Sequence, residues 1–177
     1  MLCWNRSAAL LGAALLGCSA AAWASRGHEH GVARLDVGVE AGRVFFELDI
    51  PLESLIGFER APRTEAEREK ADAAVKQLRD GASMFRIDGS AGCVLARVDL
   101  KAPPLGLGGT PPASGEHADL SGLYEFRCSA GARAGFVEVG LFEAFPGLKR
   151  IELQVVTPRG QLKATLRKPA SRVQLAR

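Results

Sequence analysis

Two histidines lie two residues apart near the start of the chain, directly ahead of a segment that alternates like a β-strand. His28 and His30 flank Glu29, and Gly31 follows them. In an extended segment, residues i and i+2 face the same side, so both imidazoles could contact one ion while Glu29 faces away or turns in as an oxygen ligand. Gly31 allows a sharp backbone turn. Neutral imidazole suits zinc, copper and nickel, so the pattern predicts a metal-binding segment. The alternative is a solvated N-terminal segment with incidental histidines.

A third histidine lies far downstream and also precedes a strand-like run. His117 comes just before a run that begins at Leu120, and Asp119 lies between them. If this strand and the one after His30 run in the same direction, their starts share one edge of the fold, where three imidazoles and a carboxylate could meet. Zinc accepts such a tetrahedral shell of three nitrogens and one oxygen. The alternative is that His117 is an ordinary loop histidine.

The composition favours a single folded domain and disfavours a nucleic-acid-binding protein. The chain has 177 residues and 47% hydrophobic content, which is enough to bury a core within one domain. Its 23 basic and 20 acidic residues give a net charge of +3 without the basic excess that is typical of nucleic-acid binders. We interpret the most basic stretch, from Arg167 to Arg177, as a solvated tail.

The start of the chain has the pattern of an export signal. An uncharged apolar run extends from Ala8 to Leu16, and Ala22-Trp23-Ala24 fits the small-x-small cleavage pattern. The run is too short to span a bilayer. We therefore predict a signal peptide over residues 1–24 and one exported domain over residues 25–177. A competing interpretation is lipoprotein processing, because Gly17-Cys18 ends a sequence that resembles the cleavage box and would leave Cys18 as a lipidated first residue.

Two cysteines remain in the predicted exported domain. Cys3 and Cys18 fall within the signal peptide, which leaves Cys93 and Cys128, 35 positions apart (128 − 93). An oxidising compartment favours their pairing, and a loop of this length predicts a stabilisation of about 3–4 kcal/mol. A redox enzyme would require a Cys-x-x-Cys motif, which the sequence lacks. We therefore predict a structural disulfide.

The elements that must position these residues are mostly strands. Seven runs alternate between apolar and polar residues, over positions 33–40, 44–50, 92–101, 120–128, 135–142, 148–156 and 161–166. The first two are joined by Ala41-Gly42 and predict a β-hairpin. Residues 102–116 are rich in proline and glycine and predict a loop without a core of its own.

One segment, over residues 64–80, has the periodicity of an amphipathic helix. Thr64 and Glu67 fit a capping box, and Ala71, Ala74 and Leu78 recur on one face. Together these elements predict a β-rich α+β domain: an antiparallel sandwich or curved sheet of about seven strands with one main helix.

An ordered set of short motifs resembles the ZrgA-like periplasmic proteins, a zinc-responsive family. The resemblance covers most of the exported domain. Its motifs are His28-Glu29-His30-Gly31 before the first strand, Gly57-Phe58-Glu59-Arg60-Ala61-Pro62, Gly92-Cys93, His117-Ala118-Asp119-Leu120, Tyr124-Glu125-Phe126-Arg127-Cys128 and Phe145-Pro146. The resemblance implies a zinc-binding protein of the Gram-negative periplasm that works alongside a zinc ABC importer, whose solute-binding subunit is the candidate partner. It also implies a Cys93–Cys128 disulfide.

The chain departs from the family pattern at two places. Family members often carry a long histidine-rich run in the loop before the position of His117, whereas this loop has no histidine until His117 itself. The family has a Gly-Phe-Glu-His-Ala-Pro motif, and in this chain Arg60 replaces the histidine of that motif. High-capacity buffering of several ions is therefore not expected, and we expect one zinc ion, bound by His28, His30 and His117 with Asp119 or Glu29 as the oxygen ligand.

Two other classes of function are weighed against zinc binding. A metal-dependent hydrolase would need an open coordination position and a general base. Glu116 or Glu59 could serve as that base, but no His-Glu-x-x-His motif or Ser/His/Asp arrangement supports them. A metal-independent envelope adaptor or structural protein would instead present its helix or its Pro/Gly loop to a partner. We expect no enzymatic activity.

Overall fold

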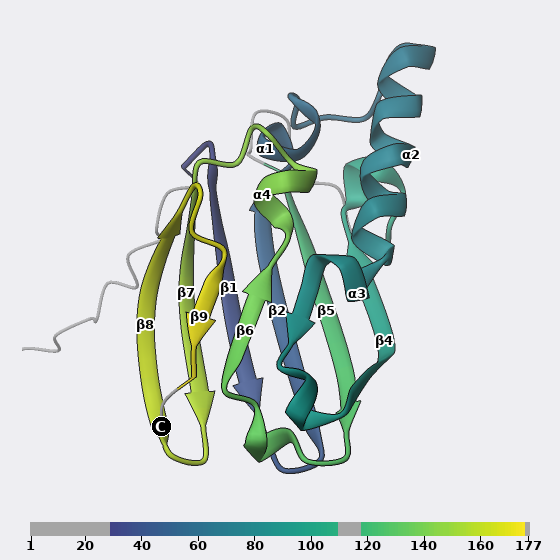
Figure 1. Ribbon diagram of the computed structural model, residues 1–177. Helices are drawn as coiled ribbons and strands as arrows, with labels where there is room; N and C mark the ends of the chain where they lie inside the picture. Colours follow the sequence, from purple (N-terminus) through teal and green to yellow (C-terminus); the bar gives the residue numbers. More distant parts are fainter. Residues whose placement is uncertain (1–28, 110–117, 176–177) are drawn as a thin grey trace, which may run out of the picture.

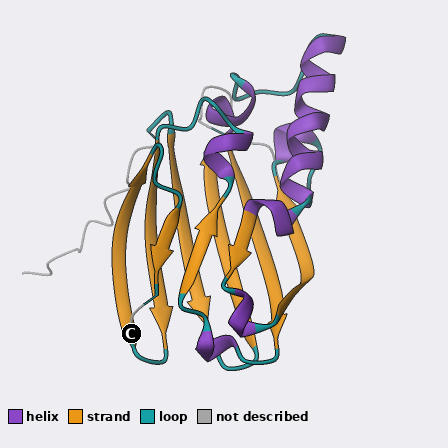
Figure 2. Cartoon of the chain, viewed as in Figure 1, coloured by secondary structure: helices purple, strands orange, loops and turns teal. Residues whose placement is uncertain are grey.

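A computed structural model describes residues 29–109 and 118–175 of the chain (Figure 1). The predicted signal peptide, Cys18, His28, Glu116 and His117 lie outside these described residues, as does most of the second half of the Pro/Gly loop. The described part is β-rich with a few helices (Figure 2), which confirms the predicted α+β class. Among its residues no helix is both long and apolar enough to cross a bilayer.

A six-stranded sheet forms the larger layer, in the order β4-β5-β2-β1-β7-β8. Its strands are β1 (Val32–Val39), β2 (Arg43–Pro51), β4 (Cys93–Lys101), β5 (Asp119–Cys128), β7 (Arg150–Thr157) and β8 (Gly160–Arg167). A three-stranded sheet in the order β3-β6-β9 forms a second layer. Its strands are β3 (Phe85–Ile87), β6 (Phe136–Val139) and β9 (Arg172–Gln174).

Short helical segments connect these strands. The α-helices are α1 (Leu52–Ile56), α2 (Glu65–Arg79), α3 (Gly81–Met84) and α4 (Leu141–Ala144). The 3-10 turns are η1 (Gly89–Ala91), η2 (Pro103–Leu105) and η3 (Gly131–Arg133). The turn η1 lies in the connection between β3 and β4, and η2 lies near the start of the predicted Pro/Gly loop.

All seven predicted strands are present, with small shifts at their ends. In β1, for example, Ala33, Leu35 and Val37 are buried while Asp36 is exposed, as the alternation predicts. The run predicted over 135–142 divides into β6 and the helical turn α4. The structure adds β3 and β9, which have three residues each. The large sheet is mixed rather than wholly antiparallel, because β1 and β7 pair in parallel.

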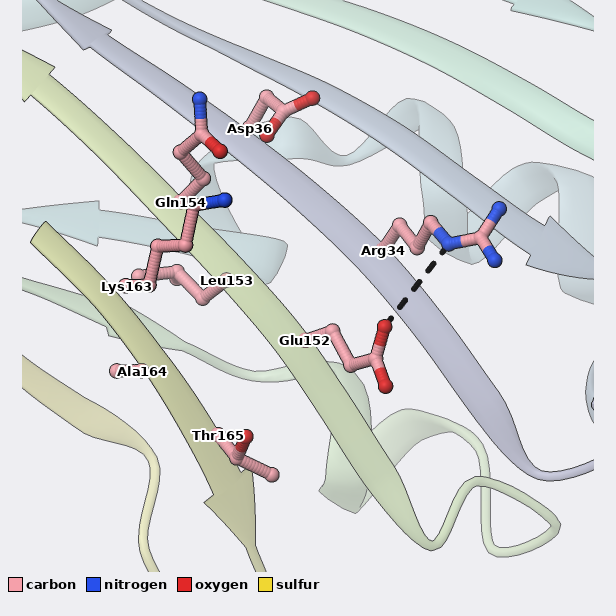
Figure 3. A pocket seen from close by; sticks show the side chains of 8 residues that line it. All are labelled: Arg34, Asp36, Glu152, Leu153, Gln154, Lys163, Ala164 and Thr165. Atoms are coloured by element: carbon pink, nitrogen blue, oxygen red, sulfur yellow. Dashed lines mark ion pairs between the residues drawn. The ribbon is translucent and has the colours of Figure 1, made fainter. Parts of the chain in front are cut away.

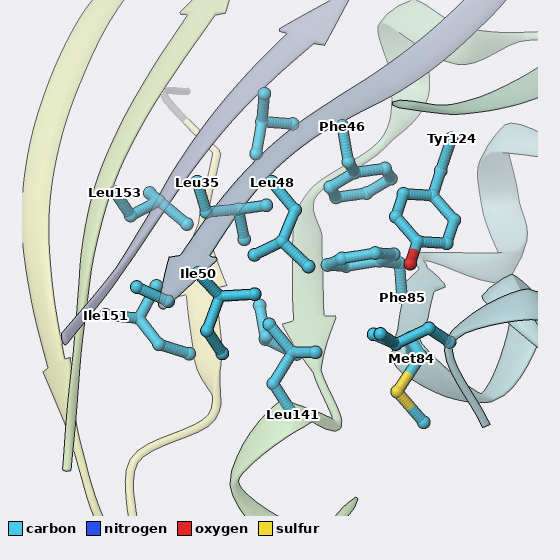
Figure 4. Packing of buried hydrophobic residues seen from close by; sticks show 14 of the residues in the cluster. Leu35, Phe46, Leu48, Ile50, Met84, Phe85, Tyr124, Leu141, Ile151 and Leu153 are labelled. Carbon is cyan, nitrogen blue, oxygen red and sulfur yellow. The ribbon is translucent and has the colours of Figure 1, made fainter. Parts of the chain in front are cut away.

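The hydrophobic core lies between the two sheets. Phe46 of β2 stacks on Phe85 of β3 with ring centroids 4.5 Å apart, and Tyr124 of β5 meets the same ring edge-on at 4.7 Å. Figure 4 shows these rings at one end of a continuous apolar cluster that extends to Ile151 and Leu153 of β7. Because one face of each sheet is buried in this core, the other face of the large sheet carries the polar residues.

Helix α2 confirms the predicted helix and its cap. The backbone N–H of Glu67 donates to Thr64 Oγ1 at 3.2 Å, and the Thr64 backbone is extended, as an N-cap residue requires. Ala71, Ala74 and Leu78 form its buried face. The helix ends at Arg79, and the chain then turns into α3.

The predicted disulfide is present and joins two neighbouring strands. Cys93 begins β4, Cys128 ends β5, and the two residues are direct cross-strand partners. The bond closes a chain of 35 positions that includes the Pro/Gly loop. It therefore holds the edge strand β4 onto the sheet at the end that is remote from the start of β5.

The interpretation of residues after Arg167 as a solvated tail is wrong for the part that the structure describes. Arg172–Gln174 form β9, which pairs with β6, and the side chains of Val173 and Leu175 are buried. The apolar residues between the basic ones had no partner evident in the sequence, and a strand of three residues is too short to show an alternating pattern.

Candidate metal site

The histidine-bearing segment is fixed by hydrogen bonds to Gly31. The Gly31 N–H donates to Ser54 Oγ of α1 at 2.8 Å, and the Gly31 carbonyl accepts from the N–H groups of Lys149 and Arg150 at 2.8 and 3.0 Å. Gly31 has φ = +82°, which confirms the predicted sharp turn at a residue without a Cβ. Ser54 is the one buried polar side chain among the described residues. These contacts hold the adjacent His30 in a defined position.

His30 makes a contact that the sequence did not suggest. Its Nε2 lies 3.1 Å from Glu59 Oε1, with 49% of the His30 side chain and 19% of the Glu59 side chain exposed. When Nε2–H donates to this carboxylate, Nδ1 carries the lone pair that a metal ligand needs. Carboxylates commonly orient metal-binding histidines in this way.

Glu29 is held by an arginine. Its two carboxylate oxygens lie 2.7 and 3.3 Å from the two terminal guanidinium nitrogens of Arg150 at the start of β7. This pairing raises the pKa of Arg150. Glu29 would have to give up a two-point charge-assisted contact to become a metal ligand.

The starts of β1 and β5 lie at the same end of the large sheet, beside α1 (Figure 1). Both strands are antiparallel to β2, which lies between them, so they run in the same direction. Continuing the β1–β2 register places Val32 opposite Pro51, and Pro51 pairs with Asp119. Two strand spacings therefore separate Val32 from Asp119, or about 10 Å. The two strands therefore run in the same direction, as the predicted meeting of the ligands requires.

A small pocket at this end of the sheet brings two of the predicted ligands together. Its volume is about 50 Å³, and it is lined by Glu29, Val32, Arg34, Asp49, Pro51, Asp119 and Glu152. One carboxylate oxygen of Asp119 is buried. Asp119 is held in place by its strand partner Pro51 and by the bond from the Leu52 N–H to the Ala118 carbonyl, 2.9 Å long.

The described residues supply only part of the predicted ligand set. His30, Glu29 and Asp119 are described, whereas His28 and His117 lie outside the described ranges. Within residues 29–109 and 118–175, no group of three or more His, Cys, Asp or Glu side chains is arranged to hold a metal ion. The full set of histidine ligands therefore stays a prediction.

The side chain at position 60, where the family pattern has a histidine, contacts helix α2. The Arg60 guanidinium contacts both Glu67 carboxylate oxygens at 2.7 and 2.8 Å. This contact, with a bond from the Arg63 N–H, lowers the pKa of Glu67 to about 2. Arg60 thus fastens the segment after α1 to the start of α2.

Sequence reasoning missed three residues that shape the site. Ser54, Arg150 and Glu59 act through contacts at separations of 23, 121 and 29 positions, and none forms a motif with its partner. The sequence marks Glu59 as part of a family motif and as a candidate general base, but not as a partner of His30. The one available signal was that Glu59 lies next to position 60, where the family motif has a histidine.

A protein-family model matches most of the chain. Residues 27–175 match the family described as ZrgA family zinc uptake protein, which spans nearly the whole predicted exported domain. No curated protein matches the sequence.

Proposed function

Because this chain belongs to the ZrgA family of zinc uptake proteins, we propose that it binds one zinc ion at the end of the large sheet where β1 and β5 begin. The proposed ligands are His28, His30 and His117, with Asp119 as the oxygen ligand. The observation that supports this set is the shared direction of β1 and β5, which brings the strand starts at Val32 and Asp119 to the same end of the sheet.

Asp119 is the oxygen ligand in this proposal, and Glu29 is the alternative. Both line the small pocket at this end of the sheet, but Glu29 is engaged by Arg150 through both oxygens. Asp119 begins β5 two residues after His117 in the sequence. An extended backbone at these positions would turn both side chains to the same side, where an imidazole and a carboxylate could bind the same ion.

Glu59 acts as the orienting partner of His30 in this proposal. Its contact with the imidazole fixes which ring nitrogen is protonated, and Ser54 fixes the backbone next to it. Such outer contacts commonly alter metal affinity by about 10–100-fold. This use of Glu59 also gives no support to the hydrolase alternative, in which Glu59 was one candidate base.

We further propose that the protein works in the periplasm as an accessory to zinc import. The disulfide supports an oxidising compartment, and family membership supports a role in uptake rather than catalysis. The proposed partner is the solute-binding subunit of a zinc ABC importer, which would receive the ion. A pull-down with that purified subunit, with and without zinc, tests this part: binding that a chelator does not alter would contradict delivery.

Titration calorimetry with zinc on the chain lacking residues 1–24 tests the site. We expect one ion per chain, and a zinc affinity that falls as the solution is acidified, because zinc requires neutral imidazole. The His30→Ala, His117→Ala double variant should lose this binding. Asp36→Ala, an exposed acid on the same sheet, is the matched control and should bind as the parent does. Millimolar affinity, or equal binding by the double variant, would refute the proposal.

A further inference from the structure

Strand β8 is the last strand of the large sheet, so no strand of the described residues pairs with its other side. It pairs with β7 along its whole length without a bulge. Because the turn has two residues, Thr157 and Gly160 form a hydrogen-bonded pair, and hydrogen-bonded and non-hydrogen-bonded pairs alternate along the rest of the two strands. The residues of β8 in non-hydrogen-bonded pairs direct their backbone groups away from β7. The outward N–H and C=O groups therefore belong to Gln161, Lys163 and Thr165. Within the described ranges, none of these groups makes a backbone bond outside the β7–β8 ladder.

The opposite edge of the same sheet is built differently. In β4 the register shifts between Leu95 and Arg97, and a bulge of this kind disturbs the pairing of an added strand. Arg97 also pairs with Asp99 on its own strand at 2.6 Å. The edge at β4 is thus irregular, and one of its two cations is paired within the strand, whereas the edge at β8 is regular.

The charge along β8 is of one sign. Glu152 is the last acidic residue of the chain, and the residues after it include six cations: Arg159, Lys163, Arg167, Lys168, Arg172 and Arg177. Lys163 and Arg167 are exposed on β8, and among the described residues neither makes an ion pair. Glu152, which lies opposite Thr165 on β7, is itself contacted by Arg34 and Arg150. No acid of the described sheet therefore neutralises this edge.

A hollow opens beside the edge on the polar face of the sheet (Figure 3). Its volume is about 410 Å³, and its lining includes Lys163 and Thr165 of β8, Gln154 of β7 and Asp36 of β1. In Figure 3 the Lys163 and Thr165 side chains stand along its β8 side, with the Arg34–Glu152 ion pair on its far side. The hollow lies over β7, on the inner side of β8, so a side chain from an added strand reaches it only by extending across β8.

We infer that the β8 edge receives an extended, acidic segment of a partner protein as an additional strand. The outward backbone groups of Gln161, Lys163 and Thr165 supply the main-chain bonds of such strand addition. Acidic side chains at alternate positions of the partner would lie against Lys163 and Arg167. This interaction is separate from the proposed zinc site and does not depend on it.

A second copy of this chain does not fit the same edge. Pairing β8 with itself would bring cations together with no acid to offset them, and like charges across a strand pair are destabilising. The lysine that repels a second copy also excludes neutral strands from a bare edge. The edge therefore selects for acidic strands.

A labelled ten-residue peptide in which glutamate alternates with valine is the probe, measured by fluorescence anisotropy with the folded chain. The Lys163→Glu, Arg167→Glu variant should weaken binding about 4–25-fold, since each exposed ion pair contributes about twofold to fivefold. Lys101→Glu on β4 makes the same kind of change at the opposite edge and should leave the affinity unchanged.

A second variant separates strand addition from simple attraction between charges. In Thr165→Pro the outward N–H is removed while the bonds to β7 remain, and an edge position tolerates proline. Strand addition predicts weaker binding in this variant, together with slower amide exchange at Lys163 in the peptide complex of the parent chain. Peptide binding that survives Thr165→Pro would show a general anion-binding surface and overturn the inference. The same conclusion would follow if double-stranded DNA or anionic vesicles abolished peptide binding and the amide exchange at Lys163 stayed unaltered in the peptide complex. Absence of peptide binding would also overturn it.

Discussion

At the scale of single residues, the placement of His30 depends on side chains that would not touch a metal. Ser54 accepts a hydrogen bond from Gly31, and Glu59 contacts the imidazole ring. The sequence predicted the turn at Gly31, because a glycine after two histidines has a local meaning. It could not predict Ser54, because a serine within a short apolar helix carries no signal of a partner 23 positions away.

Ser54→Ala should loosen the histidine segment. The buried N–H of Gly31 would lose its acceptor, which costs about 1–3 kcal/mol of unfolding free energy. Zinc affinity should also fall, because the hydrogen bond from Gly31 to Ser54 fixes the backbone next to His30. Urea denaturation and calorimetry measure the two effects. Ser90→Ala, which removes an exposed hydroxyl bonded to the Arg133 carbonyl, is the control, and an equal loss of stability in both variants would contradict the assignment.

Glu59→Gln should weaken zinc binding without unfolding the protein. The amide keeps a hydrogen-bond acceptor near His30 but loses the charge that supports the ring, so we expect an affinity loss of about tenfold. Thermal unfolding should be nearly unchanged, because this contact lies at the surface. Glu143→Gln on α4 removes an exposed charge elsewhere and serves as the comparison. A Glu59→Gln variant that binds zinc as tightly as the parent would leave Glu59 without a role at the site.

At the scale of elements, the start of α2 is fastened by charge. Arg60 holds Glu67, whose pKa of about 2 lies below its ordinary value of 4.5. The unfolded chain therefore binds a proton more readily than the folded one, so this pairing stabilises the fold above about pH 4.5. That contribution is lost as the pH falls toward 2.

Glu67→Gln should remove this pH-dependent part of the stability. The unfolding midpoint of the variant should lie below that of the parent at pH 7, and the gap should narrow steadily between pH 4.5 and pH 2.5. Thermal unfolding followed by circular dichroism at several pH values measures it. Glu65→Gln breaks only an exposed pair with Arg68 and should show a small gap at every pH. A gap for Glu67→Gln that is constant with pH would contradict the shifted pKa.

The strands and the main helix followed from sequence wherever they were long enough to show a period. Seven runs and the segment from Thr64 onward satisfied that condition. The strands β3 and β9 did not, because three residues contain barely one alternation. The parallel pairing of β1 with β7 was also hidden, since two strands far apart in sequence share no turn that would fix their direction.

At the scale of the whole molecule, topology decides whether a metal site is possible. The segments around His30 and Asp119 belong to strands that never pair with each other, and each pairs with β2. Their common direction therefore depends on the position of β2 between them. The histidines and their spacing suggest the ligand types, but only the order of the strands brings the starts of β1 and β5 to the same end of the sheet.

The disulfide provides a test of whether that end of the sheet depends on the rest of the fold. Cys93 and Cys128 join β4 to the far end of β5, about 30 Å along the strand from Asp119. The Cys93→Ser, Cys128→Ser variant should lose about 3–4 kcal/mol, because the unfolded chain regains the entropy of the closed loop. A domain of this size should then melt about 6–16 °C lower.

Zinc affinity measured well below the melting temperature should stay unchanged in this variant, because the strand start is held by β2 and not by the sulfur atoms. Zinc should also raise the melting temperature of the variant and of the parent by similar amounts, since binding to the folded state alone adds a term set by ligand concentration and affinity. Calorimetry and thermal unfolding with and without zinc measure both quantities. A folded variant that no longer binds zinc would instead show that the closed loop, which contains His117, must be held at both ends for the ligands to meet.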